Sequence, residues 1–397
     1  MTHTRWSVVF LLASVPLAWI FLNRRSADVP VARFASFNVA LNRAEPGALL
    51  AELRGGGSEQ ARRIAEIVQR HEVDVLLLCE LDRDTAGAAA EVFAHDYLAV
   101  GQNGQRGIDF EYRFVPEVNT GEPSGLDLDD DGKVGGPGDA HGFGTFPGQY
   151  ATVLLSRHPI LQDGVRTFRT LPWSAMPGAL RPPGVFTDAE WRAVRLSSKT
   201  HADVPIGIGE QGKGGRLVHV LLSHPTPPVF DGPEDRNGCR NHDEIRFWVD
   251  YLTPGSGDWI VDDRGEAGGL AAGEHFVVMG DLNCDPVDGD ARREALIRLL
   301  GHDRVFDPKP RSSGGEGWAQ RQFGANSGQR GDPALDTGDF DDTPGKGPGN
   351  LRVDYVLPSR SLQVVRSGVF WPGPLLADAK PYEASDHRLV FVDIAVR

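Results

Sequence analysis

The feature that most constrains the fold is a set of short apolar runs that carry, at or near an end, residues able to bind a metal ion or a phosphate. The run VVMG ends in Asp281 and Asn283, and a run near the N-terminus ends in Asn38. The remaining members are Glu80 and His224 at strand ends, Asp354 within a strand, and Asp386 with His387 just before the last run. In layered α/β folds, strand ends and the loops beyond them build the site. The pattern therefore predicts strands whose ends meet at one site.

The spacing of apolar residues predicts helices between these strands. Residues 58–72 have a helical period with Ser58 as N-cap, and they lie between strands expected at 32–39 and 73–82. A second helix is expected at 241–252 because its apolar residues recur every three to four positions. Further strands are expected at 150–156, 216–224, 275–283, 351–359 and 387–396. This order predicts an α/β layered domain.

Three segments do not fit the strand and helix patterns. Residues 101–149 form a glycine-rich insertion, and residues 160–215, with several prolines, are expected to be irregular. Residues 310–350 are polar, glycine-rich and acidic, which predicts an ordered loop or a mobile lid. We therefore expect one domain at 32–397 with insertions around 101–149 and 310–350, preceded by a separate segment, residues 1–31.

The charge balance bears on the kind of partner. The chain has 397 residues with a net charge of -14. This argues against binding nucleic acid through a general basic surface, although it leaves room for a locally basic or metal-charged cleft. The three cysteines, Cys79, Cys239 and Cys284, have neither zinc-ligand nor redox spacing.

The N-terminal segment contains an uncharged apolar run. Residues 7–22 lie between Arg5 and the pair Arg24–Arg25, and their length falls between a signal-peptide core and a membrane span. An uncleaved signal-anchor, or an export signal with a poor cleavage site, is the favoured interpretation, and a buried core helix is the alternative. We therefore expect a protein that is exported (periplasmic or extracellular) or membrane-anchored, although arginines on the C-terminal side weaken the exported orientation.

The strand-end residues together suit the hydrolysis of a phosphate ester. Oxygen ligands at this density favour Mg²⁺ or Mn²⁺ over zinc, and such a reaction needs charge neutralised on the phosphoryl oxygens and a positioned water. Asp354 and His387 are expected to form a carboxylate–imidazole pair. His224 and the amides of Asn38 and Asn283 are expected to donate to the phosphate. Taken singly, an Asp or Asn after a strand is usually only a turn residue.

The ordered set FNV, LCELD, LLSHP, GDLN, RVDYVL and SDH resembles the endonuclease/exonuclease/phosphatase superfamily, which has the DNase-I-like fold. The resemblance spans residues 33–397 and is to an exported bacterial-type member with insertions. It implies an α/β four-layer sandwich, in which two mixed β-sheets pack face to face and are flanked by helices.

The resemblance also implies a role for each residue of the set. Glu80 is the expected principal metal ligand, with Asn38 beside it and Asp386 near the metal. Asp281 is expected to activate or orient the attacking water, and Asn283 and His224 to bind the phosphate. His387, oriented by Asp354, is the expected general acid/base or phosphate-contacting imidazole. The roles of Asp281 and His387 are exchanged in some mechanisms for such enzymes.

The chain departs from better-known members in two places. Asp127, Asp129, Asp131 and Gly132 match the opening of an EF-hand-type calcium loop, but the twelfth position is a glycine and the acid follows at Asp139. Calcium binding and a solvated acidic turn are both open.

The second departure follows the His224 strand. There, Arg236, Asn237 and Arg240 are candidates for binding a doubly charged phosphate. Ion pairs of the two arginines with neighbouring acids are the alternative.

The resulting hypothesis is a divalent-metal-dependent phosphoester hydrolase. A small-molecule or lipid-linked phosphoester is favoured over nucleic acid as substrate, and the membrane is a partner if residues 7–22 are retained. The alternatives are a metal-dependent endo- or exonuclease and a catalytically inactive calcium-dependent binding module.

Overall fold

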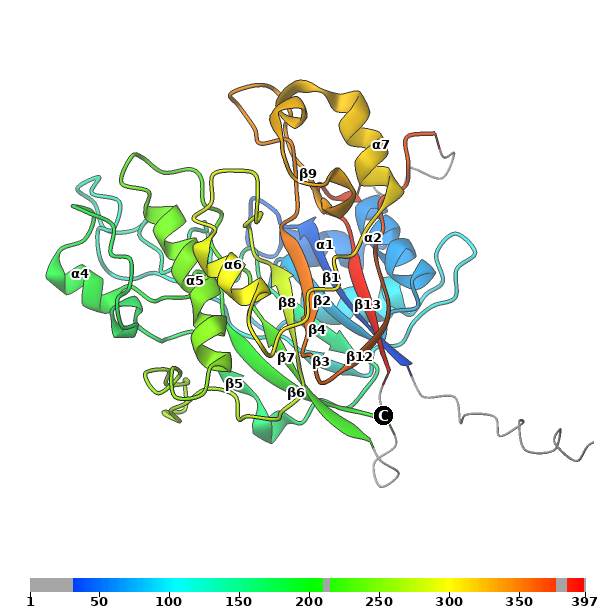
Figure 1. Cartoon of the computed structure of the whole chain (residues 1–397), viewed down its shortest axis with the longest axis horizontal. Coiled ribbons are helices and arrows are strands. Elements are labelled where there is room, and N and C mark those ends of the chain that lie inside the picture. Colours follow the sequence, from blue (N-terminus) through cyan, green and yellow to red (C-terminus); the bar gives the residue numbers. More distant parts are fainter. Residues whose placement is uncertain (1–30, 210–214, 376–383, 396–397) are drawn as a thin grey trace, which may run out of the picture.

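The computed structural model describes residues 31–209, 215–375 and 384–395 (Figure 1). The apolar run at 7–22 lies outside the described residues. Within the described ranges, no helix is both long and apolar enough to cross a membrane.

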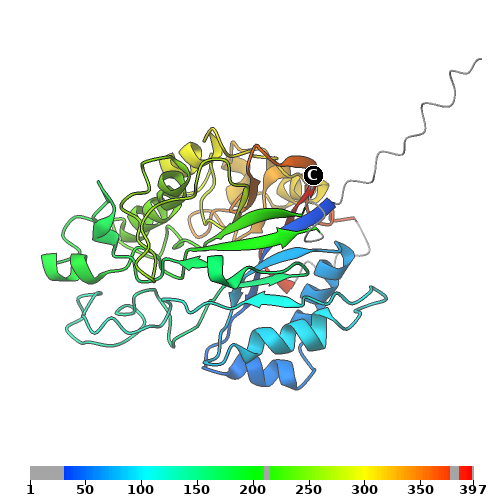
Figure 2. The ribbon, with the colours of Figure 1, turned by 90° about the horizontal axis from the view of Figure 1, so that it is seen from below.

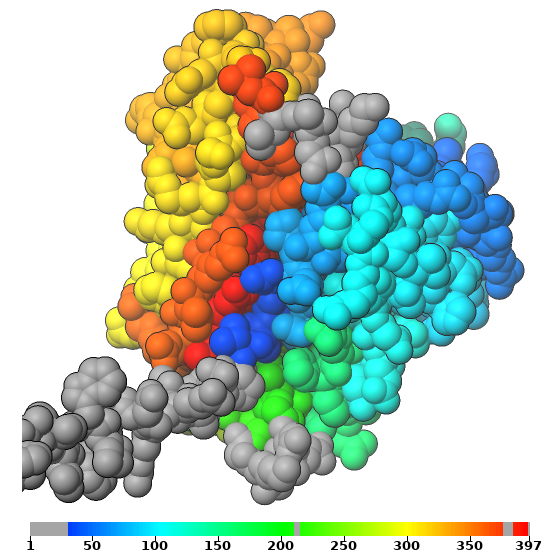
Figure 3. Space-filling model, turned by 90° about the vertical axis from the view of Figure 1, so that its right-hand side faces the viewer, coloured from blue at the N-terminus to red at the C-terminus, as the bar shows by residue number. Residues whose placement is uncertain are grey.

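The first sheet has six strands in the order β12-β13-β1-β2-β4-β3. β1 and β2 are parallel, and the other neighbours are antiparallel. The strands are β1 (Val31–Leu41), β2 (Val75–Leu81), β3 (Tyr112–Phe114), β4 (Val153–Ser156), β12 (Gln363–Val369) and β13 (Val390–Ala395). Figure 3 shows the face of the molecule where blue β1 meets the orange and red C-terminal strands.

The second sheet has five strands in the order β11-β8-β7-β6-β5, of which β7 and β8 are parallel. The strands are β5 (Arg166–Thr167), β6 (Ala202–Ile208), β7 (Arg216–Leu222), β8 (Phe276–Asp281) and β11 (Asp354–Pro358). A separate two-stranded ladder joins β9 (Gly338–Asp339) and β10 (Asn350–Leu351). Both large sheets are therefore mixed, as predicted.

Helices cover the outer faces of the two sheets. The α-helices are α1 (Ala48–Arg54), α2 (Glu59–Arg70), α3 (Ala88–Val92), α4 (Asp188–Ala193), α5 (Arg236–Leu252), α6 (Glu294–Leu300) and α7 (Ser313–Gln322). The short helices are η2 (Phe93–Leu98, a π-helix) and the 3₁₀ turns η3 (Gln162–Gly164), η4 (Trp173–Ala175), η5 (Gly324–Gly328) and η6 (Pro333–Leu335). In Figure 2 the blue helices lie below the strands, and the green and yellow helices lie above them.

Three apolar clusters hold these layers together. One joins the inner faces of the two sheets, for example Phe34 and Leu77 of the first with Val220 and Met279 of the second. The other two join each sheet to its own helices. β2 reads as an unbroken apolar run because both of its faces are buried. The four-layer sandwich expected from the sequence is confirmed.

The predicted helices are present, with one boundary moved. α2 begins after Ser58, whose hydroxyl accepts a hydrogen bond from the Ala61 N–H at 3.3 Å, and its apolar face is buried. α5 begins at Arg236 rather than at the predicted Asn241. The extra turn is polar, so the apolar period did not include it.

The prediction that residues 160–215 are irregular is wrong, because this segment contains β6. Pro205 lies in the middle of β6 and, in the sequence, argues against a strand. The Pro205 carbonyl accepts from Leu161 on the side away from β7. The proline nitrogen faces that same side, where the sheet has almost ended. Its missing N–H therefore costs β6 no hydrogen bond to β7.

The segment 310–350 is also more regular than predicted, since it contains α7. Ser312 caps this helix by accepting from the Gly315 N–H at 3.0 Å. A Cβ on Gly314 would lie 1.9 Å from the Trp371 carbonyl oxygen, so glycine permits the helix to pack against that backbone. The glycines that predicted a loop serve close packing here.

Candidate active site

The strand order places the polar strand ends next to one another. β8 and β11 are antiparallel with Asp281 directly opposite Asp354, and opposite residues point to the same face. His224 follows β7, the parallel neighbour of β8. In the other sheet, Asn38 and Glu80 lie near the carboxyl ends of the parallel strands β1 and β2. Residues from both sheets therefore meet at one place.

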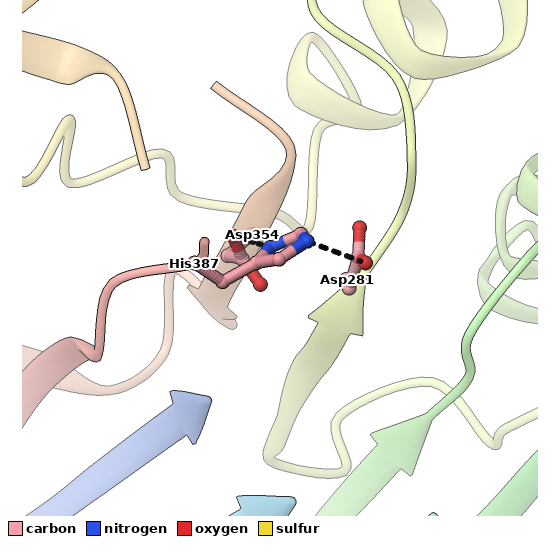
Figure 4. A group of neighbouring side chains, drawn as sticks. All are labelled: Asp281, Asp354 and His387. Atoms are coloured by element: carbon pink, nitrogen blue, oxygen red, sulfur yellow. Dashed lines mark hydrogen bonds and ion pairs between the residues drawn. The ribbon is translucent and has the colours of Figure 1, made fainter. Parts of the chain in front are cut away.

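His387 lies between two buried aspartates (Figure 4). Its Nδ1 is 2.8 Å from Oδ2 of Asp354, and its Nε2 is 3.7 Å from Oδ2 of Asp281. All three side chains are almost fully buried. The structure thus brings together the carboxylate–imidazole pair expected from the sequence and adds a second carboxylate on its other side.

Two asparagine amides hold the carboxylate of Glu80. Nδ2 of Asn38 lies 3.1 Å from Oε1 of Glu80 and 3.1 Å from Oδ2 of Asp281. Nδ2 of Asn42 lies 3.0 Å from the other carboxylate oxygen, Oε2. Asn38 therefore links the predicted metal ligand to the predicted catalytic aspartate.

Burial and neighbouring charges separate the pKa values of the site. Burial, together with the carboxylate of Asp354, raises the pKa of Asp281 to about 6. Burial alone would lower the pKa of His387, but Asp354 and Asp281 raise it to about 10. Burial also raises the pKa of Glu80. At neutral pH, Asp281 is therefore mostly ionised and His387 is an imidazolium.

His224 is the neutral histidine of the site. It is 1% exposed, and Nε2 lies 3.4 Å from Oδ2 of Asp281 without forming a hydrogen bond. Burial, followed by the positive charges of Lys199 and His387, places the pKa of His224 well below its ordinary value. Within the described chain neither ring nitrogen has a hydrogen-bond partner. An unpartnered buried donor of this kind suits a bound ligand.

The backbone of the site contains residues in the left-handed region. Glu80 has φ +60° and Asn283 has φ +50°. Asparagine tolerates this conformation, but glutamate does so at a cost of about 1–2 kcal/mol, and such strain gathers at functional sites. Gly280 is required for another reason: a Cβ there would lie 1.9 Å from the Ser223 carbonyl oxygen. The GDLN segment is thus shaped by its approach to β7.

The side chains of Asn283 and Asp386 have contacts other than those predicted for them. The N–H of Asn283 donates to Oδ1 of Asp281 at 2.9 Å, and its side-chain amide donates to the Pro225 carbonyl at 3.1 Å. Asp386 is exposed, and Ser385 donates to its carboxylate at 3.4 Å. A phosphate contact for Asn283 and a metal contact for Asp386 stay predictions.

The three candidate substrate-binding residues around the start of α5 contact backbone carbonyls. Arg236 donates to Leu128, Asn237 to Val229, and Arg240 to the carbonyls of His141, Arg195 and Leu196. The ion pairs considered for Arg236 and Arg240 are also absent among the described residues. These contacts fasten loops to α5, and substrate binding by the three side chains stays a prediction.

The acidic loop brings together three of its four candidate calcium ligands. Carboxylate oxygens of Asp127, Asp129 and Asp139 lie within 4.8 Å of one another. Asp139 is 3% exposed and accepts from two backbone N–H groups. Asp131 is not part of this group; its side chain accepts from the Lys133 N–H. Calcium binding stays a prediction.

Three residues at or behind the site were not expected from the sequence. Asn42 follows β1, and its signal was a second asparagine four residues after Asn38. Lys199 lies in the segment predicted to be irregular and is 6% exposed. Glu244, fully buried in α5, accepts hydrogen bonds from the loops that carry Lys199 and His224. Nothing local in the sequence marks Lys199 or Glu244.

The donor set fits a hard divalent cation near Glu80. Oδ1 of Asp354 is buried without a hydrogen-bond partner in the described chain, and the pKa values of Glu80 and Asp281 are raised. A bound cation would stabilise these carboxylates in their charged form. The group Asp281, Asp354 and His387 is compact enough for an ion, but an imidazolium repels one. Glu80 is therefore the better candidate for a ligand. Asn38 turns Nδ2 rather than its oxygen toward Glu80, so a metal contact for Asn38 stays a prediction.

The model of the endonuclease/exonuclease/phosphatase family matches residues 35–387. No curated protein sequence matches the chain significantly.

Several solved structures are similar to the chain at low sequence identity. An endonuclease/exonuclease/phosphatase from Beutenbergia cavernae is 18% identical, with a TM-score of 0.48, over 92% of this chain and 72% of the other. Sphingomyelinase C from Streptomyces griseocarneus is 16% identical, with a TM-score of 0.45, over 92% and 99%. A mannosyl-6-phosphatase from Bacteroides thetaiotaomicron is 13% identical, with a TM-score of 0.43, over 91% and 99%.

Proposed function

Because the chain belongs to the endonuclease/exonuclease/phosphatase family, we propose that it is a divalent-metal-dependent phosphodiesterase or phosphatase for a small or lipid-linked substrate. At the level of reaction class it is a hydrolase acting on phosphoester bonds. The observation that carries the proposal is the imidazolium of His387 between buried Asp354 and Asp281, beside the Asn38–Glu80 pair.

The opposite pKa shifts of Asp281 and His387 favour one of the two assignments of acid and base. Groups whose environments push their pKa values apart take opposite roles. Asp281, with a pKa of about 6, is ionised at neutral pH and accepts a proton from the attacking water. His387, with a pKa of about 10, keeps its proton and stabilises negative charge on the phosphoryl oxygens. Asp354 holds its Nδ1 and so fixes the ring.

Glu80 and Asn38 would hold the cation, with Asp386 a further candidate. When bound, Mg²⁺ or Mn²⁺ would neutralise charge on the phosphoryl oxygens and polarise the water. The neutral ring of His224 and the amide of Asn38 add donors beside Asp281. Preorganised donors of this kind contribute most where water is excluded.

The net charge of -14 supports a small or lipid-linked substrate. Duplex DNA is bound mainly through phosphate contacts from basic residues. The chain has 55 acidic against 41 basic residues. A substrate with a single phosphate group needs only the cation and the local donors.

The test is a substrate panel with metal titration on the purified protein. Bis-p-nitrophenyl phosphate, p-nitrophenyl phosphate and p-nitrophenylphosphorylcholine are compared with supercoiled plasmid in Mg²⁺ and Mn²⁺. We expect hydrolysis of at least one nitrophenyl ester, loss of activity in chelator, and recovery when the metal is restored. Plasmid nicking without ester cleavage would make the chain a nuclease, and full activity in excess chelator would remove the metal dependence.

Asp281→Asn and His387→Ala test the site. General acid–base groups contribute roughly 10²–10⁴-fold, so each variant is expected to lose at least about a hundredfold in kcat. Unchanged hydrolysis in both would contradict the site. No hydrolysis by the wild type, combined with calcium binding, would favour the inactive calcium-dependent module.

We also propose that the protein acts outside the cytoplasm or at the membrane, on the strength of the apolar run at 7–22. Cell fractionation of the full chain and of a variant lacking residues 1–31 tests this. The full chain is expected in the membrane or exported fraction and the shortened chain in the cytoplasm. The same distribution for both would contradict the proposal.

A further inference from the structure

Lys199 is a buried lysine that borders the site and has no bonded partner in the part of the chain that the structure describes. It is 6% exposed and lies between α4 and β6. No acceptor among the described residues lies within hydrogen-bond or ion-pair distance of its ammonium. Lysine is almost never this deeply buried unless it is paired, because an ammonium loses its hydration there. Within the described ranges, the ammonium of Lys199 therefore lacks a hydrogen-bond or ion-pair partner.

The charges around Lys199 are those of the site. Burial lowers its pKa, and the carboxylates of Glu244, Glu80 and Asp281 act against that effect. Its own charge contributes to the lowered pKa of His224. The ammonium therefore lies near Glu80, Asp281 and His224 at once, although it contacts none of them.

Glu244 fixes the backbone of two loops: the one that carries Lys199, called the lysine loop, and the one that carries His224, called the histidine loop. One of its carboxylate oxygens accepts from the Ser198 N–H at 2.6 Å and from the Ser198 hydroxyl at 2.9 Å. The other accepts from the Thr226 N–H at 2.6 Å. Ser198 precedes Lys199, and Thr226 follows two residues after His224. A single buried carboxylate thus sets the distance between the lysine loop and the histidine loop.

A second contact holds the lysine loop from the other direction. The N–H of Asn119 donates to the Lys199 carbonyl at 2.9 Å, and the Asn119 side chain donates to the Ser197 carbonyl at 2.7 Å. The backbone of Lys199 is therefore fixed before any ligand arrives. Preorganisation of this kind lowers the cost of ordering a side chain on binding.

We propose that Lys199 binds a nonbridging oxygen of the substrate's phosphoryl group, and that Glu244 is the residue that positions it. This inference rests on the proposed phosphoester hydrolysis. A phosphoryl group supplies the acceptor oxygens that the ammonium lacks. A fixed cation beside the phosphoryl group also stabilises the charge that develops in the transition state. The neutral His224 donates beside it without adding charge.

The competing role is structural, in which the charge of Lys199 offsets Glu80 and Asp281. The melting temperature of Lys199→Met distinguishes the ligand-binding role from the structural role. If Lys199 serves to bind the substrate, Lys199→Met removes a buried charge that has no partner among the described residues. Tm then stays the same or rises. If the ammonium offsets the acids structurally, the same variant lowers Tm, because Glu80 and Asp281 lose the positive charge that offsets them.

The experiment compares wild type, Lys199→Met and Lys199→Arg, with Lys309→Met as the matched control. Lys309 is exposed in the segment between α6 and α7, so its variant removes the same charge away from the site. Three quantities are measured in saturating Mg²⁺: kcat/KM for the best nitrophenyl ester, binding of inorganic phosphate by calorimetry, and Tm. The concentration of Mg²⁺ that gives half-maximal activity is measured as well.

For Lys199→Met we expect phosphate binding to weaken by at least about tenfold and kcat/KM to fall about a hundredfold, the scale of one lost electrostatic donor. Tm should not fall, and the Mg²⁺ requirement should change less than about threefold. Lys199→Arg should recover part of the loss, and Lys309→Met should match wild type.

Two results would overturn the role of Lys199: unchanged phosphate affinity in Lys199→Met, or a fall in Tm that accounts for the loss of activity. A wild type that binds phosphate through Lys199 but hydrolyses no ester would contradict the proposed function and leave the lysine site standing. A wild type that does not bind phosphate in Mg²⁺ would contradict the lysine site.

Discussion

The two insertions, residues 101–149 and 310–350, look alike in sequence but support different parts of the molecule. Both are rich in glycine and acidic residues. The second stands at the top of Figure 1 as α7 and β9 and reaches the reacting pair itself. The first holds the backbone of the lysine loop and carries the acidic loop away from the site. Insertions of similar composition therefore support different parts of the site: the second supports the reacting pair, and the first supports the loop that carries Lys199.

The contacts of the second insertion converge on Asp354 and His387. The hydroxyl of Thr337 accepts from the N–H groups of Val353 (3.0 Å) and Asp354 (2.9 Å). Gly338 forms a β-bridge with His387, and the ring of Phe340 lies edge-on to the imidazole, with 5.3 Å between ring centres. The first residue of β11, the residue before it and the catalytic ring thus depend on this insertion.

The contacts of the first insertion reach the loop that carries Lys199 but not the catalytic side chains. Asn119 holds the carbonyls of Ser197 and Lys199. Thr120, buried within the insertion, donates to the Gln149 carbonyl. None of these residues contacts Asp281, Asp354 or His387 in the described structure. Damage to the second insertion should therefore affect turnover, and comparable damage to the first, away from Asn119, should affect mainly stability.

The largest expected effect comes from the carboxylate that the second insertion holds in place. Asp354→Asn removes the charge that keeps His387 protonated, and kcat is expected to fall by at least about a hundredfold. Asp127→Asn, the same chemical change in the first insertion, is expected to keep kcat within about twofold. Steady-state hydrolysis in saturating Mg²⁺ measures both, and equal losses would remove the distinction between the insertions.

A matched pair of buried threonines tests the insertions more directly. Thr337→Val leaves two buried N–H groups without their acceptor, at a cost of about 1–3 kcal/mol for each unsatisfied group. We expect a lower Tm together with roughly a tenfold loss in kcat, because Asp354 is one of the two donors. Thr120→Val loses one hydrogen bond in the first insertion and should lower Tm with kcat unchanged. Unaltered turnover in Thr337→Val would contradict a role for the second insertion in catalysis.

The strand-end residues could be predicted because their signal is local. An apolar run followed by Asp, Asn or His is visible in a few letters, and parallel strands bring such ends together whatever lies between them. Asn38, Glu80, His224, Asp281, Asp354 and His387 are all found at one place. β6 was missed because Pro205 argues against a strand unless the edge it faces is known.

The supporting residues could not be predicted because their contacts join distant parts of the chain. Glu244 reaches Ser198 across 46 residues, and Thr337 reaches Asp354 across 17. No periodicity links such positions, and a buried lysine such as Lys199 looks like a surface residue until the fold encloses it. The difference between the two insertions could not be predicted for the same reason, because it depends on tertiary contacts.

Opposite responses to pH provide a third test of the comparison. Burial, with Asp285 and Asp288 nearby, raises the pKa of Asp336 in the second insertion to about 8. Its stabilising contribution is present below the unfolded pKa of about 4 and is lost as pH rises through 8. Burial, with Arg195 and Arg240 nearby, lowers the pKa of His141 in the first insertion to about 4. Its contribution is present above about 6.5 and is lost as pH falls through 4.

Melting temperatures between pH 4 and 9 measure both responses. Asp336→Asn, which mimics the protonated acid, should remove part of the alkaline fall in Tm, by roughly 2–4 °C per kcal/mol. His141→Gln should remove part of the acid fall. Each variant should leave the other limb unchanged, and a variant that flattens both limbs, or neither, would contradict the assignment.

The smallest expected effect concerns calcium and the loop of Asp127, Asp129 and Asp139. If these carboxylates bind Ca²⁺, the folded state is stabilised by roughly 1.4 kcal/mol at ten times Kd, so Tm should rise by a few degrees. Asp129→Asn should abolish the rise, and Asp290→Asn, a change at an exposed acid outside the insertion, should leave it intact.

Calcium should change the stability of the protein but not its hydrolysis in saturating Mg²⁺, because the acidic loop has no contact with the described catalytic residues. No shift in Tm at millimolar calcium would identify the loop as a solvated acidic turn. A shift that survives Asp129→Asn would place the ion elsewhere. A calcium effect on kcat that Asp129→Asn removes would show that the first insertion, like the second, communicates with the reacting groups.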